Sequence, residues 1–356
     1  MTVGLELMHN AYSDLDGTAF WRTGVVDASP LAMAEIYKKR WTLEPDWKIA
    51  TAGSCFAQHI AGYLMRNGYN ILNVEPAPSA LPEELRRRYG YSLYSGRYGN
   101  IYTSRQLLQL FQEVFGEASV APIIWQRDGR FFDAYRPAVE PEGLPSADEV
   151  TQSRAYHLER LGVLFREMDV FVFTMGMTET WQDVETGQVV PIAPGVIAGE
   201  EHVARVALKN LSCEEVVADF REIMRILDAQ RTKELRYILT VSPVPITATG
   251  SGLHVLAASS YTKATLRSAA GTLYQHHQAV DYFPGYEIVT NPSARGVFFE
   301  PNLRSVSAEG VDLTMRIFFS QQRPRQPTGG SDATEQDLLF LDEPACEEVL
   351  LDAFGP

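Results

Sequence analysis

Ser54 is the residue of this sequence best placed to act as a nucleophile. It lies in the run Gly-Ser-Cys-Phe-Ala at residues 53–57, between a β-rich run and a run with helical periodicity. A sharp strand-to-helix turn presents such a serine at the helix N-terminus, where backbone N–H groups and the helix dipole stabilise developing negative charge. The run therefore predicts acyl-transfer chemistry at Ser54, and simple capping of the helix by this serine is the alternative.

Cys55 follows Ser54 directly, and a thiolate at a helix N-terminus would be the stronger nucleophile of the two. Adjacent residues at the start of a helix differ by about 100° in direction, so they cannot both face one site. We therefore expect Ser54 to face the site and Cys55 to pack as a small buried residue.

A serine nucleophile needs a general base, and histidine is the usual one. Among the 7 histidines, His254 lies in a Gly-rich loop at residues 247–254, just past a β-rich run. His59 lies five residues after Ser54 on the following helix and is rotated away from it by about 140°. His254 is thus the candidate base, and a structural or substrate-contacting loop histidine is the alternative.

The elements that must position these residues alternate between β-rich and helical runs. The β-rich runs lie at residues 48–52, 70–74, 170–175, 236–241 and 286–290. Helical periodicity marks residues 56–66, 157–167, 214–229 and 263–276. This alternation predicts an α/β fold around a central parallel sheet of about five strands. In such sheets ligands bind at the carboxyl ends of the strands, which is where Ser54 would lie.

Several separated segments of the sequence resemble the GSCFA family in the same order and spacing. They are Ala-Gly-Ser-Cys-Phe-Ala at 52–57, Gly-Met-Thr-Glu-Thr-Trp at 176–181, Thr-Val-Ser-Pro-Val-Pro at 240–245, and the blocks at 261–267 and 282–288. The resemblance spans residues 40–320. The family is grouped with the SGNH (GDSL-like) hydrolases, so the resemblance implies a flavodoxin-like three-layer α/β/α sandwich and serine-dependent ester chemistry, often on acylated carbohydrates.

Carried over residue by residue, the resemblance gives Ser54 the role of the SGNH nucleophile. The block at residues 98–102 resembles the oxyanion-hole segment, so Gly99 and Asn100 are expected there, with the Gly99 amide donating beside the Ser54 amide. Thr178 takes the position of the SGNH asparagine that donates to the oxyanion. Glu179 is expected to orient the base, to bind a substrate hydroxyl or to form a structural ion pair.

The sequence departs from the SGNH pattern in its last block. SGNH enzymes carry Asp-x-x-His there, whereas this chain has Asn-Leu-Arg-Ser at 302–305. A serine without a base is a poor nucleophile, so the chain must supply a base from elsewhere, use another mechanism or be inactive. The leading expectation is a deacylase acting on carbohydrate O-acyl esters. An O-acyltransferase and a non-catalytic protein that binds a glycan or nucleotide-sugar are the alternatives.

Further candidates for substrate binding are Arg97, Arg136 and Trp181, which fall in segments expected to border the site. Arginine grips carboxylates bidentately and would suit an acidic sugar, although surface ion pairing is the simpler interpretation. Lys263 and Arg267 lie one helical turn apart and are expected on a solvated face.

The sequence predicts three regions. Residues 1–47 form an N-terminal extension packing on the core, and residues 48–320 form the α/β domain, with irregular inserts at 75–145 and 182–210. Residues 321–356 comprise a Pro/Gly linker and an acidic tail whose apolar residues allow docking on the body or on a partner.

Composition bounds the class of protein further. With 31 Lys and Arg against 45 Asp and Glu, the net charge of −14 argues against nucleic-acid binding.

The sequence shows no apolar run long enough to span a membrane and no signal-peptide pattern, so a cytoplasmic location is expected. The 3 cysteines suit neither a disulfide framework nor a zinc cluster, and no metal or cofactor is expected. The expected partner is a small-molecule or glycan ester, and the oligomeric state is left open.

Overall fold

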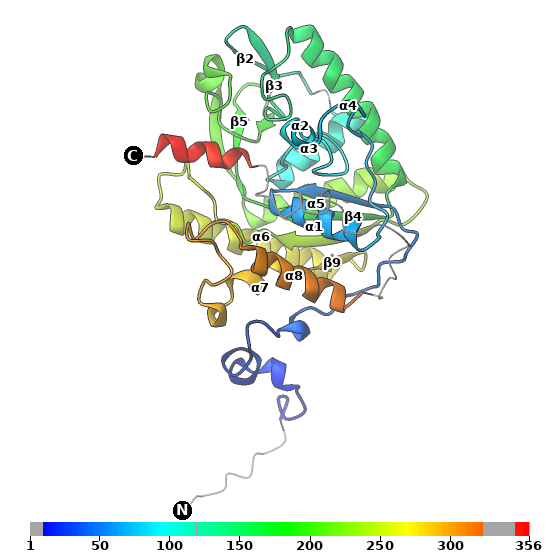
Figure 1. Cartoon of the computed structure of the whole chain (residues 1–356), viewed down its shortest axis with the longest axis vertical. Helices are drawn as coiled ribbons and strands as arrows, with labels where there is room; N and C mark the ends of the chain where they lie inside the picture. Colours follow the sequence, from blue (N-terminus) through cyan, green and yellow to red (C-terminus); the bar gives the residue numbers. More distant parts are fainter. Residues whose placement is uncertain (1–9, 119, 323–345, 356) are drawn as a thin grey trace, which may run out of the picture.

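A four-stranded parallel sheet forms the centre of the computed structural model, which describes residues 10–118, 120–322 and 346–355 (Figure 1). The strand order is β1 (Ile49–Gly53), β4 (Val170–Met175), β8 (Arg236–Val241) and β9 (Val280–Tyr282). Every residue of β1 and β4 is buried, as expected for strands covered on both faces. The predicted α/β class with a central parallel sheet is therefore confirmed.

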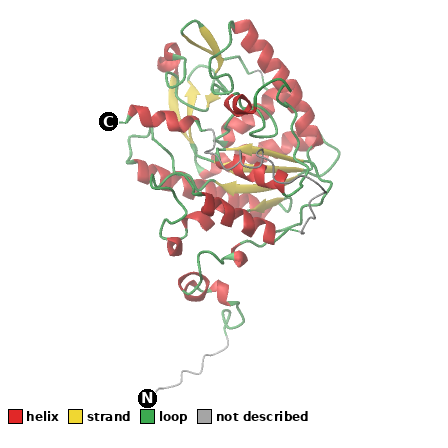
Figure 2. Cartoon of the chain, in the orientation of Figure 1, coloured by secondary structure: helices red, strands yellow, loops and turns green. Residues whose placement is uncertain are grey.

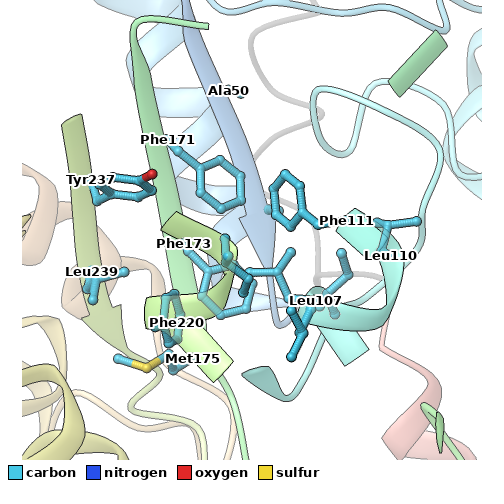
Figure 3. Close-up of a cluster of buried hydrophobic side chains, with 14 of the residues drawn as sticks. Ala50, Leu107, Leu110, Phe111, Phe171, Phe173, Met175, Phe220, Tyr237 and Leu239 are labelled. Atoms are coloured by element: carbon cyan, nitrogen blue, oxygen red, sulfur yellow. The ribbon is translucent and has the colours of Figure 1, made fainter. Parts of the chain in front are cut away.

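Helices cover both faces of the sheet because alternate strand residues point to opposite sides. On one face Phe171 and Phe173 pack with residues of α3 (Ser104–Phe115), α4 (Ala147–Glu167), α5 (Cys213–Ala229) and α6 (Val255–His276). Figure 3 shows Leu107 and Phe111 of α3 facing these two phenylalanines. On the other face Val172 packs with residues of α1 (Phe56–Arg66), α7 (Gly285–Thr290) and α8 (Ala308–Ser320).

Serine and threonine side chains start four of these helices. Each accepts a hydrogen bond from a backbone N–H of the first turn, which satisfies a donor that the helix itself leaves unpaired. The residues are Thr103 before α3, Ser146 before α4, Ser212 before α5 and Ser307 before α8.

Two expected strands differ from the structure. Residues 70–74 contribute a single parallel bridge between Ile71 and Ile49. The expected strand at 286–290 is wrong, because these residues form α7, and the edge strand is β9 instead. A short apolar run such as Ile288-Val289 has no periodicity that separates a buried helical turn from a strand. In the described part of the chain the sheet therefore has four strands and not five.

The two inserts contain small antiparallel sheets (Figure 2). The first insert carries α2 (Glu83–Arg88), α3 and the hairpin of β2 (Ile124–Arg127) and β3 (Arg130–Asp133). The second sheet has the order β6 (Val189–Val190), β5 (Glu179–Asp183) and β7 (Val206–Asn210). Short helical turns complete the chain at Gly17–Ala19, Arg22–Val26, Ala34–Ile36, Glu200–Arg205 and Pro292–Ala294.

The described residues before and after the α/β domain differ in how closely they pack on it. At the N-terminal side Tyr37 and Leu43 are buried in the core, whereas Tyr12 and Trp21 are exposed in the segment that projects from the body in Figure 1. Most of the expected linker and acidic tail, residues 323–345, lies outside the described residues. The chain is described again from Cys346, and Glu347–Phe354 form a 3-10 helix.

Candidate functional site

Ser54 follows the last residue of β1 and is 3% exposed. Its Oγ is buried and has no hydrogen-bond partner among the described residues. Helix α1 begins after Cys55 without a side-chain cap, so capping by Ser54 is not its role in this structure. The preceding Gly53 has φ +138°, and a Cβ there would lie 2.4 Å from the carbonyl oxygen of Thr174. Only glycine therefore allows this turn into the helix.

Gly176 lets the end of β4 approach Ser54 closely. A Cβ on Gly176 would lie 2.9 Å from the Cβ of Ser54 and 3.3 Å from the ring of Tyr102. The Gly176 and Met177 amides both donate to the Tyr102 carbonyl, each at 3.1 Å. Tyr102, Gly176 and Ser54 thus form one tightly packed group at the carboxyl ends of β1 and β4.

Lys263 of α6 points into this group. Its side chain is buried and Nζ donates to the Gly176 carbonyl at 2.7 Å. Burial lowers the pKa of Lys263 to about 8, although the neighbouring Glu348 and Cys55 oppose that shift. The expectation of a solvated face is therefore wrong for Lys263, while Arg267 is half-exposed and pairs with Glu287.

Gly99 and Asn100, which the resemblance assigned to the oxyanion hole, lie in the same region as Tyr102 and Glu347. Gly99 has φ +68° and forms a turn. The Asn100 side-chain amide donates to the carboxylate of Glu347, and the Tyr102 hydroxyl donates to the same carboxylate at 2.7 Å. A Cβ on Gly99 would lie 3.6 Å from the Glu347 Oε1. The Glu347 carboxylate therefore lies beside both residues that the resemblance assigned to the oxyanion hole.

Two other expected oxyanion donors have partners already. The Ser54 amide donates to the Thr174 carbonyl at 3.0 Å. The Thr178 hydroxyl donates to Asn210 Oδ1 at 2.6 Å and lies 3.0 Å from the hydroxyl of Thr262. Because a hydroxyl has one proton, Thr178 holds β5, β7 and α6 together in this arrangement instead of donating to a ligand.

His254 lies at the start of α6 and is exposed. Its Nδ1 accepts the backbone N–H of Leu256 at 3.2 Å, so it caps the helix. No hydrogen bond between the described residues joins His254 to Ser54. This position fits the alternative expectation for His254, that of a structural loop histidine.

Glu179 orients the loop that precedes His254, and it does not orient a histidine side chain. Its carboxylate accepts the Thr249 hydroxyl at 2.6 Å and the Gly250 amide at 3.0 Å. Trp181 packs on the same loop, since a Cβ on Gly250 would lie 3.2 Å from its ring. The block at 176–181 thus supports the loop between β8 and α6.

The arginines expected to bind substrate are internal structural residues. Arg97 donates to the Tyr89 carbonyl at 2.7 Å and to Glu140 at 2.9 Å. Arg136 donates to Asp133 at 2.8 Å, and Arg154 pairs with the same carboxylate at 3.1 Å. These two guanidinium groups outweigh burial and lower the pKa of Asp133 to about 2. The guanidinium groups of Arg97 and Arg136 are thus already paired within the fold, and the expectation that they bind substrate is wrong.

Sequence reasoning missed the contribution of the C-terminal segment 346–348. Arg304 donates to Glu348 at 3.0 Å and approaches the Cys346 sulfur at 4.0 Å. A hydrogen bond between the side chains of Cys55 and Cys346, together with burial, raises the pKa of Cys55. The segment therefore lies against the residues that surround Ser54. The apolar residues within the acidic tail were the one sequence signal that it could dock.

Neither a metal centre nor a membrane span is found in the parts of the chain that the structure describes. No group of three or more His, Cys, Asp and Glu side chains in residues 10–118, 120–322 and 346–355 could hold a metal ion. No helix in these ranges is both long enough and apolar enough to cross a membrane.

The fold and the site together define an α/β protein with a buried serine at the carboxyl end of a parallel strand. Residues 48–318 match the GSCFA family, and the chain belongs to this family. Comparison with curated proteins gives no match.

Proposed function

We propose that this protein is a serine-dependent acyl hydrolase of the SGNH type, with Ser54 as its nucleophile. The observation that carries the proposal is the buried Ser54 hydroxyl, which has no hydrogen-bond partner among the described residues. Leaving a buried hydroxyl unsatisfied costs about 1–3 kcal/mol, and a catalytic role is one explanation of such a group. Its place before α1 suits a group that develops negative charge.

The proposed reaction proceeds in two steps. The Ser54 oxygen attacks the ester carbonyl and gives its proton to a base, and the tetrahedral oxyanion is held by the Gly99 amide and the Asn100 side chain. The ester alcohol leaves with that proton, and an acyl-enzyme remains. Water then attacks the acyl group, the carboxylic acid departs, and Ser54 regains its proton.

We favour Lys263 over His254 as the base. Lys263 and Ser54 both contact Gly176, and burial lowers the lysine pKa to about 8, so a useful fraction of the amine is neutral near pH 8. His254 is exposed and caps a helix. A Ser-Lys arrangement would also account for the absence of Asp-x-x-His in this chain.

The proposed substrates are O-acyl esters of carbohydrates. The 3% exposure of Ser54 also favours a second outcome, because an acyl-enzyme shielded from water can pass its acyl group to a sugar hydroxyl. Hydrolysis and transfer share the same acyl-enzyme, so only the products separate them.

The test is acyl release from a panel of O-acetylated polysaccharides by the purified chain. We expect acetate release, or acetyl transfer to an added sugar, by the wild type and by Cys55→Ala, and neither with Ser54→Ala. A folded wild type that binds a glycan but neither releases nor transfers its acetyl group would instead identify a binding protein.

A further inference from the structure

The C-terminal segment brings two carboxylates to the site. Glu347 is held by Asn100 and by the Tyr102 hydroxyl, as described above. Glu348 is buried, accepts a hydrogen bond from Arg304 at 3.0 Å and another from the backbone N–H of Thr247. These contacts are those of a bound acidic ligand, although both carboxylates belong to the same chain.

The contact between Arg304 and Glu348 is incomplete on both sides. The Nε of Arg304 and the Oε1 of Glu348 are buried without a hydrogen-bond partner in the described residues. Arginine binds a carboxylate best through two parallel N–H groups, and here only one is used. A free carboxylate that approached Arg304 along the fork could therefore make a better contact than the tethered Glu348.

We propose that Arg304, with Lys263 beside it, is a carboxylate-binding subsite next to Ser54, and that the C-terminal segment occupies it until a carboxylate-bearing ester displaces it. This inference rests on the proposed function and adds to it a substrate class and a form of autoinhibition. Arg304 is the permanent cation of this subsite, and the charge that Lys263 carries in its protonated form also acts on Glu348.

The place of Glu347 supports the same interpretation. Ester hydrolysis yields a carboxylic acid, and the Glu347 carboxylate is bound by Asn100, the residue proposed to hold the oxyanion. The segment thus resembles a product with one carboxylate at the reaction centre and a second at Arg304. The second carboxylate of a true substrate can lie on a uronic acid ring or on a diacid acyl group such as succinyl.

Binding measured in a Ser54→Ala background tests the inference without turnover. The ligands are D-galacturonate and succinate, with D-galactose as the neutral control, and the method is isothermal titration calorimetry. Every protein carries Ser54→Ala. One has no further change, a second also carries Glu347→Ala and Glu348→Ala, and a third, the control, also carries Asp352→Asn. Asp352 is an exposed acid on the same 3-10 helix.

We expect at least one of the two acids to bind about tenfold or more tightly when both glutamates are removed, and galactose to bind equally to all variants. Asp352→Asn should leave the affinities unchanged. Adding Arg304→Gln, or the charge-preserving Arg304→Lys, to the variant without the two glutamates should abolish or strongly weaken the gain in affinity. Neither glutamine nor lysine has the paired N–H groups of a guanidinium. Binding by galacturonate identifies a uronate, and binding by succinate identifies a diacid acyl group.

Equal affinities for both acids in all variants, or a gain that survives both Arg304 substitutions, would overturn the inference. Circular dichroism of each variant establishes that it is folded. Because Ser54 is absent from every protein in this series, such a result would leave the proposed serine chemistry untouched. Failure of the serine chemistry, conversely, would show in the acetate-release assay.

Discussion

The Tyr102 hydroxyl donates a hydrogen bond of 2.7 Å to the carboxylate of Glu347, a residue 245 positions further along the chain. The backbone carbonyl of the same tyrosine accepts the amides of Gly176 and Met177 at the end of β4. One residue therefore connects the C-terminal segment to the strand ends that surround Ser54. This connection explains how a segment beyond the family match can act on the site.

Substitutions of Lys263 and His254 distinguish the two candidate bases. If Lys263 is the base, Lys263→Met lowers kcat/KM by about 10²–10⁴-fold, and Lys263→Arg does so as well, because arginine keeps the donor but does not deprotonate. His254→Ala should keep near-wild-type activity and lose about 1 kcal/mol of stability as a helix cap. Steady-state kinetics and thermal unfolding measure both effects. The opposite ranking of the two activities would restore His254 as the base.

The pH dependence of the reaction follows from the same lysine. A base works when deprotonated, so the rate should rise with pH through a midpoint near the lysine pKa of about 8. Burial lowers the pKa of Lys263, Arg304 lowers it further, and Glu348 and Cys55 raise it. Glu348→Gln removes a negative charge, so we expect the midpoint to move to lower pH. A midpoint that stays in place or rises in a pH–rate profile would contradict this arrangement.

Gly53 sets the turn that presents Ser54. Gly53→Ala should lower the free energy of unfolding by more than about 2 kcal/mol, because its Cβ would lie 2.4 Å from the Thr174 carbonyl oxygen. Gly68 is the matched control, since it also has positive φ, +73°, but nothing within 4 Å of an added Cβ. Gly68→Ala should cost about 1 kcal/mol from backbone strain alone. Denaturant unfolding of both variants measures the difference, and equal losses would show that the close approach to Thr174 is unimportant.

Arg136 should affect stability and not substrate affinity. Removing it as Arg136→Met leaves the buried Asp133 paired with Arg154 and hydrogen-bonded to the Tyr135 amide, and we expect a loss of about 3 kcal/mol in the free energy of unfolding. Arg22→Met, at a surface ion pair whose arginine side chain is 86% exposed, should change stability by less than about 0.5 kcal/mol. A KM that rises in Arg136→Met without a loss of stability would instead indicate substrate binding.

Acid should weaken the same cluster. Burial alone would raise the pKa of Asp133, but Arg154 and Arg136 outweigh it and hold the folded-state pKa at about 2, below the ordinary aspartate value of 3.8. A group with a depressed pKa contributes stability above its unfolded pKa and loses it as pH falls through the folded value. We therefore expect the part of the stability that depends on Asp133 to disappear between about pH 4 and pH 2, and Asp133→Asn to remove this dependence in unfolding measured against pH.

The sequence predicted secondary structure correctly where a local pattern determined it. The apolar β-rich runs at 170–175 and 236–241 became β4 and β8, and the motif at 52–57 placed Ser54 at the strand-to-helix turn. The pattern failed where short apolar runs were ambiguous, as at Ile288, which packs from a helix. A strand and a helix bury such a residue equally well, so its neighbours in space determine which of the two forms.

The site was harder to predict because its charged groups come from distant parts of the chain. Lys263 was expected in solvent because charge on a helix usually faces water, yet it is buried and donates to the Gly176 carbonyl. Arg304 and Glu348 meet only through the fold of the C-terminal segment. Conversely, Arg97 and Arg136 looked available from the sequence, because their buried backbone and carboxylate partners are visible only in three dimensions.

Labelling of the chain with a fluorophosphonate probe, with the modified residue located by peptide mass mapping, shows directly whether Ser54 is an activated nucleophile. Wild-type protein and Cys55→Ala should both take up one probe per chain on Ser54, and removal of the C-terminal carboxylates by Glu347→Ala and Glu348→Ala should accelerate labelling. Ser54→Ala should not label. Labelling at another residue, or a folded wild type and a folded Glu347→Ala/Glu348→Ala variant that both stay unlabelled, would contradict an activated serine at this position.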